Sequence, residues 1–472
     1  MTTTQQQRAH TSPTAAEQLA RFAAGLRFDD LPPEVVQRAK QLILDLVGVA
    51  LAARDLPASE AVRAVVRSMG GTAESTLWGS GEKLPACNAA LANGTLAHGL
   101  DYDDTQLPAQ AHLSASVVPT AVASAEATDA DGRAAIAACV AGWEVGLRIG
   151  AAAPGRFVDG GFHPTAICGT FASATIAGVL RGLDEGQLAN ALGLALSQAS
   201  GTMAFVDGAT WSKKMHPGWA AHSGCIAALL AQQGFTGPRT AFEGRFGLYN
   251  THICSKDYDL ETLVAGLGTT WEMLRISMKP YPACHFIHSF MDAALYLKET
   301  HGLEPAAIDS IHCKITEQAI AIVCEPHAEK LRPQDDYAAK FSLPFSVATA
   351  LVQGRGGLAE FSDAAVHDRA VLDLASKVTY SVDPESTFPR YYPGWVIVRM
   401  RDGAVYERRE PIHRAAVERP LSEAEVIAKY RDCVGASLDD ERAEALAERV
   451  LNLERQSSLA AVVGLMAAAV GA

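Results

Sequence analysis

The chain has 472 residues, of which 49% are hydrophobic and 20% are charged. This composition is typical of a well-buried globular protein, and the length exceeds what one hydrophobic core usually organises. We therefore expect two domains, or one large domain that carries a smaller one. The net charge of −13 argues against a nucleic-acid-binding surface, because phosphate binding needs a basic face.

The cysteine pattern and the apolar runs bear on the compartment. Nine cysteines are scattered without a CxxC pair, which is typical of reduced thiols in the cytosol. The first residues, MTTTQQQRAHTSPT, lack the apolar segment of a secretory signal. The longest apolar runs, at 134–140 and 461–470, are too short and too rich in alanine to span a membrane. We expect a cytoplasmic protein that contacts neither membrane nor nucleic acid.

Helical patterns dominate the chain up to residue 269. Residues 14–25 have apolar residues at helical spacing, and Pro32 and Pro33 open a second helix with a wide apolar face. Further helices rich in small residues are predicted at 115–127, 132–152, 170–182, 188–198 and 219–233. Because these segments lack the alternation of half-buried strands, they predict closely packed helices.

Strand patterns begin beyond residue 269. Alternating β-branched residues predict strands within 308–324 and 377–382, and 395–409 predicts a hairpin that turns at Asp402 and Gly403. Helical spacing is found at 288–300, 343–353, 421–434 and 439–472. The sequence thus predicts a mainly α protein with a disordered tail at 1–13, an all-α domain from 14–269 and 411–472, and an inserted α+β domain at 270–410.

One stretch, residues 97–120, concentrates ionisable groups among small apolar residues. Its polar members are His98, Asp101, Asp103, Asp104, Thr105 and His112. Burying an uncompensated charge is costly, so such groups are paired, hydrogen-bonded or functional. The alternative is structural, because aspartates and a threonine can cap a helix. Both roles remain open from the residues alone.

Three more polar segments stand in apolar surroundings, at 161–171, 211–224 and 279–293. The first contains His163, which could simply be a hydrogen-bonded histidine before a helix that starts at Pro164. The second contains Lys213 and Lys214, for which a solvated surface pair is the alternative.

The third of these segments contains Lys279, Tyr281 and His285. Pro280 and Pro282 would stiffen it as a connector between domains. That reading is compatible with function, because binding sites often lie between domains.

The sequence contains no motif for a metal or a nucleotide cofactor. It lacks HExxH, paired cysteines, a calcium loop, GxGxxG after a strand, a P-loop and a serine elbow. We therefore expect no metal site and no cofactor. Histidine, lysine, aspartate, threonine and tyrosine can move protons and hold carboxylates unaided, which suits a small substrate with several carboxylates.

Taken in order, these segments resemble the MmgE/PrpD family, which includes 2-methylcitrate dehydratase, cis-aconitate decarboxylase and iminodisuccinate epimerase. The likeness is carried by LPPEVVQRAKQLILDLVGVALAA, ANGTLAHGLDYDDT, GFHPT, SKKMHPGWAAHSG, KPYPACHFIHSFMDA, AKFSLPFSVATAL and PLSEAEVIAKYRD. The resemblance implies an all-α domain built from both chain ends, a smaller α+β domain, a homodimer without cofactor and an active site between the domains.

The resemblance also implies particular site residues. The family's catalytic positions fall on Asp101, Thr105, His112, His163 and Lys213, and further substrate-binding positions on Lys279, Tyr281, His285 and Phe345. Three features depart from the named relatives. Phe345 replaces a tyrosine of the decarboxylases, TQLPAQAHLSAS lacks an aromatic-rich stretch of the enteric-type dehydratases, and leucine rather than proline follows His112.

From the resemblance we expect a lyase that transfers a proton beside a carboxylate of a small di- or tricarboxylate, by dehydration or decarboxylation. Epimerisation of an iminodisuccinate-like substrate stays open, as do a metal-dependent hydrolase and a non-catalytic polycarboxylate-binding protein. In this hypothesis His163 transfers the proton and His112 lies opposite it. Lys213 and Lys279 hold carboxylates, Asp101 orients a histidine and Thr105 hydrogen-bonds a carboxylate.

Overall fold

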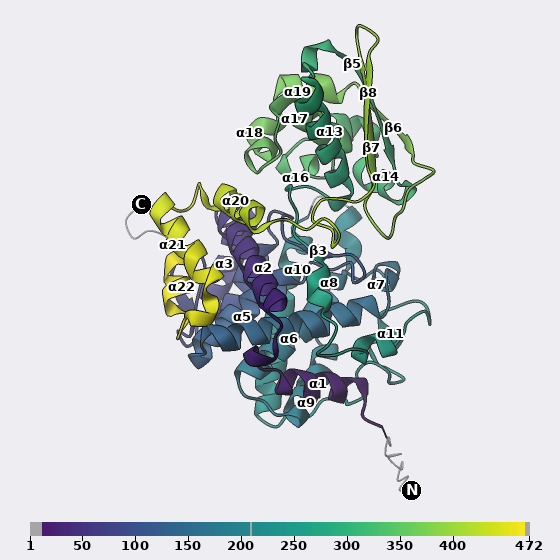
Figure 1. Ribbon diagram of the computed structural model, residues 1–472. Helices are drawn as coiled ribbons and strands as arrows, with labels where there is room; N and C mark the ends of the chain where they lie inside the picture. Colours follow the sequence, from purple (N-terminus) through teal and green to yellow (C-terminus); the bar gives the residue numbers. More distant parts are fainter. Residues whose placement is uncertain (1–11, 208–209, 468–472) are drawn as a thin grey trace.

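The computed structural model describes residues 12–207 and 210–467 (Figure 1). Its buried residues form two large hydrophobic cores. One core is built from residues between 15 and 278 and between 415 and 466, and we call the region that contains this core the helical part. The other core is built from residues between 281 and 398, and we call the region that contains this core the sheet-bearing part. Apart from Ser12 and Pro13, the predicted tail at 1–13 lies outside the described residues.

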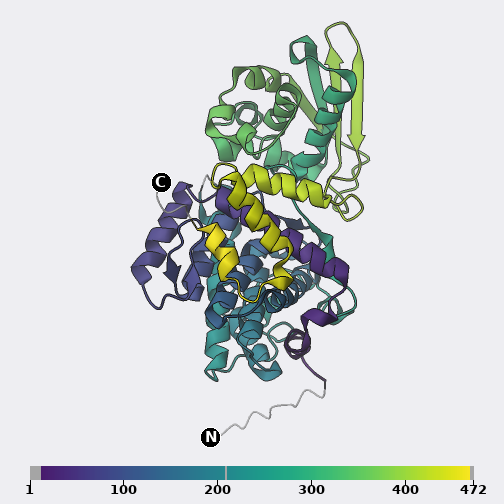
Figure 2. The same ribbon diagram turned by 60° about the vertical axis from the view of Figure 1, so that its left-hand side comes forward.

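The two ends of the chain meet in the helical part. Helix α1 (Ala15–Gly25) starts with a capping box in which Thr14 and Glu17 satisfy each other's backbone N–H groups. Helix α2 (Pro33–Ala52) starts at a proline, whose fixed φ suits a first helical position. Helices α20 (Glu423–Val434) and α21 (Asp440–Leu451) pack against α2. Figure 2 shows these yellow C-terminal helices beside the purple N-terminal ones.

The centre of the helical part is a group of closely packed helices. They are α4 (Ala86–Ala97), α5 (Ser114–Thr128), α6 (Gly132–Ala151), α8 (Pro164–Leu180), α9 (Glu185–Leu196) and α10 (Ser212–Gln232). Helices α4 and α10 touch through Gly94 and Gly218, because a Cβ on Gly94 would lie 2.7 Å from the Cα of Gly218. This close crossing brings the end of α4 near the first turns of α10.

Helix α6 is, among the described residues, the single helix that is long and apolar enough to cross a membrane. Its apolar window is 89% buried inside the protein. It therefore serves here as a central helix of the core.

A four-stranded sheet defines the other part. Its strands are β5 (Ile308–Ile315), β6 (Val378–Val382), β7 (Gly394–Met400) and β8 (Val405–Glu410). The spatial order is β6-β5-β7-β8, with β5 and β6 parallel and the other pairs antiparallel. Helices α13 (His288–His301), α17 (Leu343–Gln353) and α19 (Arg369–Ala375) lie on one side of the sheet (Figure 1). The hairpin predicted at 395–409 is present as β7 and β8.

The remaining elements are short or peripheral. Among them are α3 (Pro57–Met69), α7 (Arg156–Asp159), α11 (Leu248–Thr251), α12 (Glu261–Val264), α14 (Glu317–Val323), α15 (His327–Leu331), α16 (Asp336–Ala339), α18 (Asp363–Val366), α22 (Ala460–Met466), β1 (Ser75–Thr76) and β2 (Lys83–Leu84). One small pair matters for the site. Strand β3 (Thr105–Gln106) pairs antiparallel with β4 (Ile276–Ser277), which joins the polar stretch to the segment before Lys279.

The mainly α composition is confirmed, and the differences lie at element boundaries. Helix α8 starts at Pro164, as the structural alternative for His163 assumed, rather than at 170, and α10 starts at Ser212 rather than at 219. Helix α10 contains Pro217 in its interior, and an internal proline normally indicates a boundary. As a result Lys213 lies in the first turn of a helix instead of at a surface turn. The expected strand region 308–324 divides into β5 and α14.

Candidate active site

The structure brings the polar segments together around the turn that follows α4. Residues 98–104 form this turn between α4 and β3. His163 immediately precedes α8, Lys213 lies at the start of α10, and Lys279 lies between the two parts. All three side chains are at least nine-tenths buried. The polar segments therefore share one buried region.

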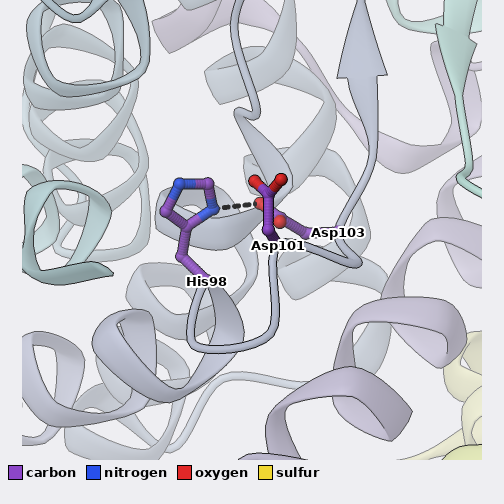
Figure 3. A group of neighbouring side chains, drawn as sticks. All are labelled: His98, Asp101 and Asp103. Carbon is purple, nitrogen blue, oxygen red and sulfur yellow. Dashed lines mark hydrogen bonds and ion pairs between the residues drawn. The ribbon is translucent and has the colours of Figure 1, made fainter. Parts of the chain in front are cut away.

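His98 and Asp103 form a buried pair at one side of this region. The Nδ1 of His98 lies 2.7 Å from Oδ2 of Asp103, and both side chains are fully buried (Figure 3). Burial alone would raise the pKa of Asp103, but the contact with His98 holds that pKa below its ordinary value. The carboxylate accepts the Nδ1–H bond, while Nε2 of His98 has no hydrogen-bond partner among the described residues. The pair thus presents a buried, unpaired ring nitrogen.

Asp101 lies between two lysines. Its carboxylate is 2.5 Å from Nζ of Lys213 and 3.3 Å from Nζ of Lys279. Burial would raise the pKa of Asp101, but the two ammonium groups hold it well below the usual range. Burial would likewise lower the pKa of Lys213, but Asp101 overcomes this and raises it. Asp101 and Lys213 are therefore charged at neutral pH and form a buried ion pair.

His112 is held through one ring nitrogen. Its Nδ1 lies 2.8 Å from the carbonyl oxygen of Asp104 and 3.0 Å from Oγ1 of Thr105. A carbonyl can only accept, so Nδ1 carries the proton and Nε2 of the neutral ring holds a free lone pair. Burial lowers the pKa of His112 to about 3. At neutral pH the ring is therefore neutral, and its Nε2 can accept a hydrogen bond.

His163 is paired with a second histidine, His216. Their Nδ1 atoms are 3.0 Å apart, so one ring donates and the other accepts. Burial lowers the pKa of His163 well below its ordinary value and that of His216 to about 4. The ring centroid of His163 lies 5.9 Å from that of His98 and 6.2 Å from that of His112. We call His98, His112, His163 and His216 the catalytic-side histidines.

His98, Asp101 and Asp103 also offer ligand atoms that lie within 4.8 Å of one another, as a metal site would require. Both oxygens of Asp101 already contact ammonium groups, and Asp103 accepts from His98. Two lysine charges repel a divalent cation at this distance. The arrangement is suited to binding carboxylates rather than a cation.

The third polar segment, residues 279–293, contributes Lys279 to the site, while its later residues lie at the base of the sheet-bearing part. Tyr281 donates to Oδ1 of Asp292 over 2.7 Å. His285 stacks between His288 and Tyr392, with ring centroids 4.6 and 4.5 Å away. Neither ring nitrogen of His285 has a hydrogen-bond partner among the described residues.

His285 also lines a cavity of about 540 Å³ between the two parts. Thr105, Arg275 and Arg390 contribute to the same lining. Thr105 connects this cavity with the catalytic-side histidines, because it lines the cavity and its Oγ1 contacts the ring of His112. The cavity is therefore adjacent to the catalytic-side histidines, and its lining carries two guanidinium groups and one carboxylate, that of Glu418.

Phe345 is placed elsewhere. It is fully buried in the core of the sheet-bearing part, with its ring centroid 5.9 Å from that of Phe361. Two residues for which no catalytic or binding role was expected, His98 and His216, lie beside the expected ones. For His216 a signal existed, because it follows Lys213 by three residues and a helix places such neighbours on one face.

The fold and the site define a mostly helical protein with a smaller α+β part and a buried site of histidine, lysine and aspartate at their junction. Comparison with known proteins agrees with this class. The MmgE/PrpD N-terminal domain matches residues 17–261, and the MmgE/PrpD C-terminal domain matches residues 281–455. The chain belongs to the MmgE/PrpD family.

Its curated relatives include cis-aconitate decarboxylases. One from Aspergillus terreus (strain NIH 2624 / FGSC A1156) is 29% identical over 471 residues and covers 95% of both chains. The cis-aconitate decarboxylase of Homo sapiens is 27% identical over 448 residues, which is 93% of this chain and 91% of the human protein. Family and relatives together support a lyase function at the level of the family.

Proposed function

We propose that the protein is a cofactor-independent lyase that decarboxylates a small unsaturated tricarboxylate of the cis-aconitate type. The observation that carries this proposal is the meeting of the catalytic-side histidines with Asp101 and its two lysines. The names of the relatives favour decarboxylation over the other reactions of the family.

The charges at the site suit a polyanionic substrate. Lys213 and Lys279 lie near the carboxylates of Asp101 and Asp103, and the adjacent cavity carries the guanidinium groups of Arg275 and Arg390. A substrate carboxylate placed here can accept hydrogen bonds from these cationic groups, which are the strong, charge-assisted kind. Local basic groups can attract an anion even to a protein of net negative charge.

The histidines can supply the proton that decarboxylation needs. Loss of carbon dioxide breaks a carbon–carbon bond, and its electron pair remains on the substrate until an acid protonates a carbon atom. In the free protein His112 and His163 are neutral because burial lowers both pKa values. A bound anion favours the imidazolium form and raises these values. Substrate binding thereby prepares the proton donor.

We assign the proton transfer to His163, with His112 on the opposite side of the substrate. Lys213 and Lys279 hold carboxylates and stabilise the developing negative charge. Asp103, rather than Asp101, is the aspartate that hydrogen-bonds a histidine, so we assign the orienting of His98 to Asp103. We assign to Asp101 the placing of Lys213 and Lys279. Thr105 hydrogen-bonds a carboxylate from its place beside the cavity.

The reaction can be tested by incubating the protein with cis-aconitate, 2-methylcitrate, citrate and iminodisuccinate in deuterated water and following each by NMR. We expect carbon dioxide and a deuterium-labelled product from cis-aconitate. A dehydrated product from a hydroxy acid, or deuterium exchange without net conversion, would instead show a dehydratase or an epimerase. Binding without turnover or exchange would overturn the proposal in favour of a binding protein. Loss of activity with a chelator and recovery with a divalent ion would favour a metal-dependent enzyme.

A further inference from the structure

Three lysines donate to three consecutive carbonyl groups in the turn after α4. Nζ of Lys340 lies 3.2 Å from the carbonyl oxygen of Leu100. Nζ of Lys279 lies 2.6 Å from that of Asp101, and Nζ of Lys429 lies 2.9 Å from that of Tyr102. The turn is therefore held through its backbone as well as through the Asp101 carboxylate.

These lysines come from distant parts of the chain. Lys340 follows α16 in the sheet-bearing part, Lys279 lies in the connection between the parts, and Lys429 lies on α20 (Figure 1). Their exposed fractions are 2%, 1% and 7%. A buried ammonium group is costly without partners, and packing alone needs no charge there. Because three such groups contact one turn, we expect these lysines to have a specific role there.

The turn needs support because Asp101 has a left-handed backbone. Its φ is +54°, a region that is unfavourable for residues other than glycine and is maintained by the surrounding structure. The carbonyls of this turn also follow the C-terminal end of α4, where cations interact favourably with the helix dipole. Ammonium groups are thus well matched donors for this backbone.

We propose that Lys340 and Lys429 are positioning residues that hold Asp101 between Lys213 and Lys279, a role that rests on the proposed function of the site. Lys340 belongs to the sheet-bearing part, so the contact with Leu100 links the geometry of the site to the placement of that part. Lys429 does the same from the C-terminal helices. Neither lysine needs to touch the substrate.

Lys340 is the better residue to change. Its partner Asp336 lies 3.5 Å away with a side chain that is 32% exposed, so water can solvate this carboxylate after the change. Lys429 pairs instead with Asp45, whose side chain is 1% exposed, at 2.7 Å. Replacing Lys429 alone would leave a buried charge, which is strongly destabilising. The second variant is therefore the double substitution Lys429→Met with Asp45→Asn.

Lys340→Met is expected to lower kcat about tenfold or more, because small misplacements of site groups have effects of this size. It should also move the alkaline limb of the pH profile of kcat/KM to lower pH. Asp101 raises the pKa of Lys213 against the effect of burial, so a displaced Asp101 lets that pKa fall. The titratable groups around Lys213 are Asp101, Asp103, Tyr337, Lys214, Lys279, Cys284, His112, His163 and His216.

The matched control is Lys298→Met. Nζ of Lys298 donates to the carbonyl oxygen of Leu351 over 2.5 Å within the sheet-bearing part, so the same chemistry is removed away from the site. We expect its kcat to stay within about twofold of wild type and its pH profile to stay unchanged. A purely structural role of Lys340 would lower the melting temperature without moving the alkaline limb.

A crystal structure of Lys340→Met separates this inference from the proposed function, because it requires no turnover. We expect the Asp101 carboxylate to leave its place between Lys213 and Lys279. An unchanged Asp101, or an unchanged alkaline limb, would overturn the inference. If Lys340→Met does not fold, the double variant carries the same measurements. If the wild type turns over none of the tested substrates, the proposed function fails and the crystal structure alone decides the positioning role.

Discussion

Among the described residues, two groups of histidines lie largely in the interior, and they differ in what surrounds them. The catalytic-side histidines lie beside Asp103 and near the charged trio of Asp101 and its lysines. The second group, His285, His288 and His413, is packed with Tyr392 at the base of the sheet-bearing part. Burial lowers the pKa of all three members of the second group. A lowered pKa therefore does not by itself distinguish a catalytic histidine from a packed one.

The contacts distinguish the two groups. In the second group the contacts are mainly ring to ring, and neither hydrogen bond involves a charged group: Nε2 of His288 lies 2.9 Å from the carbonyl oxygen of Ala283, and the backbone N–H of Tyr392 donates to Nδ1 of His413 over 3.3 Å. On the catalytic side each ring is oriented by a carboxylate, a carbonyl or another imidazole. Fixed tautomers beside charged groups are what proton transfer to a polyanion needs.

The largest effect is expected from His163→Gln. Positioned proton transfer contributes roughly 10²- to 10⁴-fold, so kcat should fall by that factor with the fold intact. His288→Gln is the matched change in the second group and should alter kcat by less than about threefold. Steady-state kinetics with circular dichroism of both variants checks this comparison, and equal effects of the two changes would remove the distinction between the groups.

Asp103→Asn should have the next largest effect. The amide keeps the shape of the carboxylate but loses the charge that fixes the tautomer of His98, so we expect kcat to fall at least about tenfold. Asp292→Asn, which alters the partner of Tyr281, serves as the control. If kinetics showed that both variants retain wild-type turnover, His98 would have no part in the reaction.

Acid should destabilise the protein through the catalytic-side histidines. The folded pKa values of His112 and His216 are about 3 and about 4, below the unfolded value of about 6.5. Below pH 6.5 the unfolded chain then binds more protons than the folded chain. The contribution of these histidines to the free energy of unfolding is therefore complete above that pH and falls as the pH drops towards 4. Each such histidine contributes up to about 1.4 kcal/mol per pH unit.

Asp104 acts in the opposite direction, because burial raises its pKa to about 7. Its contribution to stability is present at low pH and is lost as the pH rises through 7. Urea unfolding between pH 4 and pH 8 measures the sum of these terms. His216→Gln should flatten the acid slope, and an unchanged slope would show that His216 is not buried in the neutral form.

The smallest effect on turnover is expected from Phe345→Tyr. Phe345 lies in the core of the sheet-bearing part, where an added hydroxyl group needs a hydrogen-bond partner. An unsatisfied buried hydroxyl costs about 1–3 kcal/mol, so the melting temperature should fall while kcat changes by less than about threefold. A large gain in kcat would place residue 345 in the active site after all.

The sequence predicted the polar segments because charged residues among alanine and leucine are conspicuous. It could not predict how they meet. The contact of α4 with α10 depends on Gly94 and Gly218, and the pairing of β3 with β4 joins residues far apart in the chain. Neither contact can be recognised from the residues that neighbour it in the sequence.

The same limit applies to individual residues. His98 was noted but received no role, because its partner Asp103 is set by the turn between them. The anchoring of that turn by Lys340 and Lys429 arises from residues more than 200 positions away. Helix and strand patterns, by contrast, depend on near neighbours, which is why the mainly α composition and the hairpin could be predicted.

Deuterium transfer from solvent tests the central claim most directly. Wild type and His163→Gln would be incubated with cis-aconitate in deuterated water, and carbon dioxide and product deuterium would be measured together. We predict that the wild type places one deuterium on the product carbon for each carbon dioxide released, and that His163→Gln loses both signals together. Full activity of His163→Gln, or carbon dioxide released without deuterium incorporation, would contradict the account.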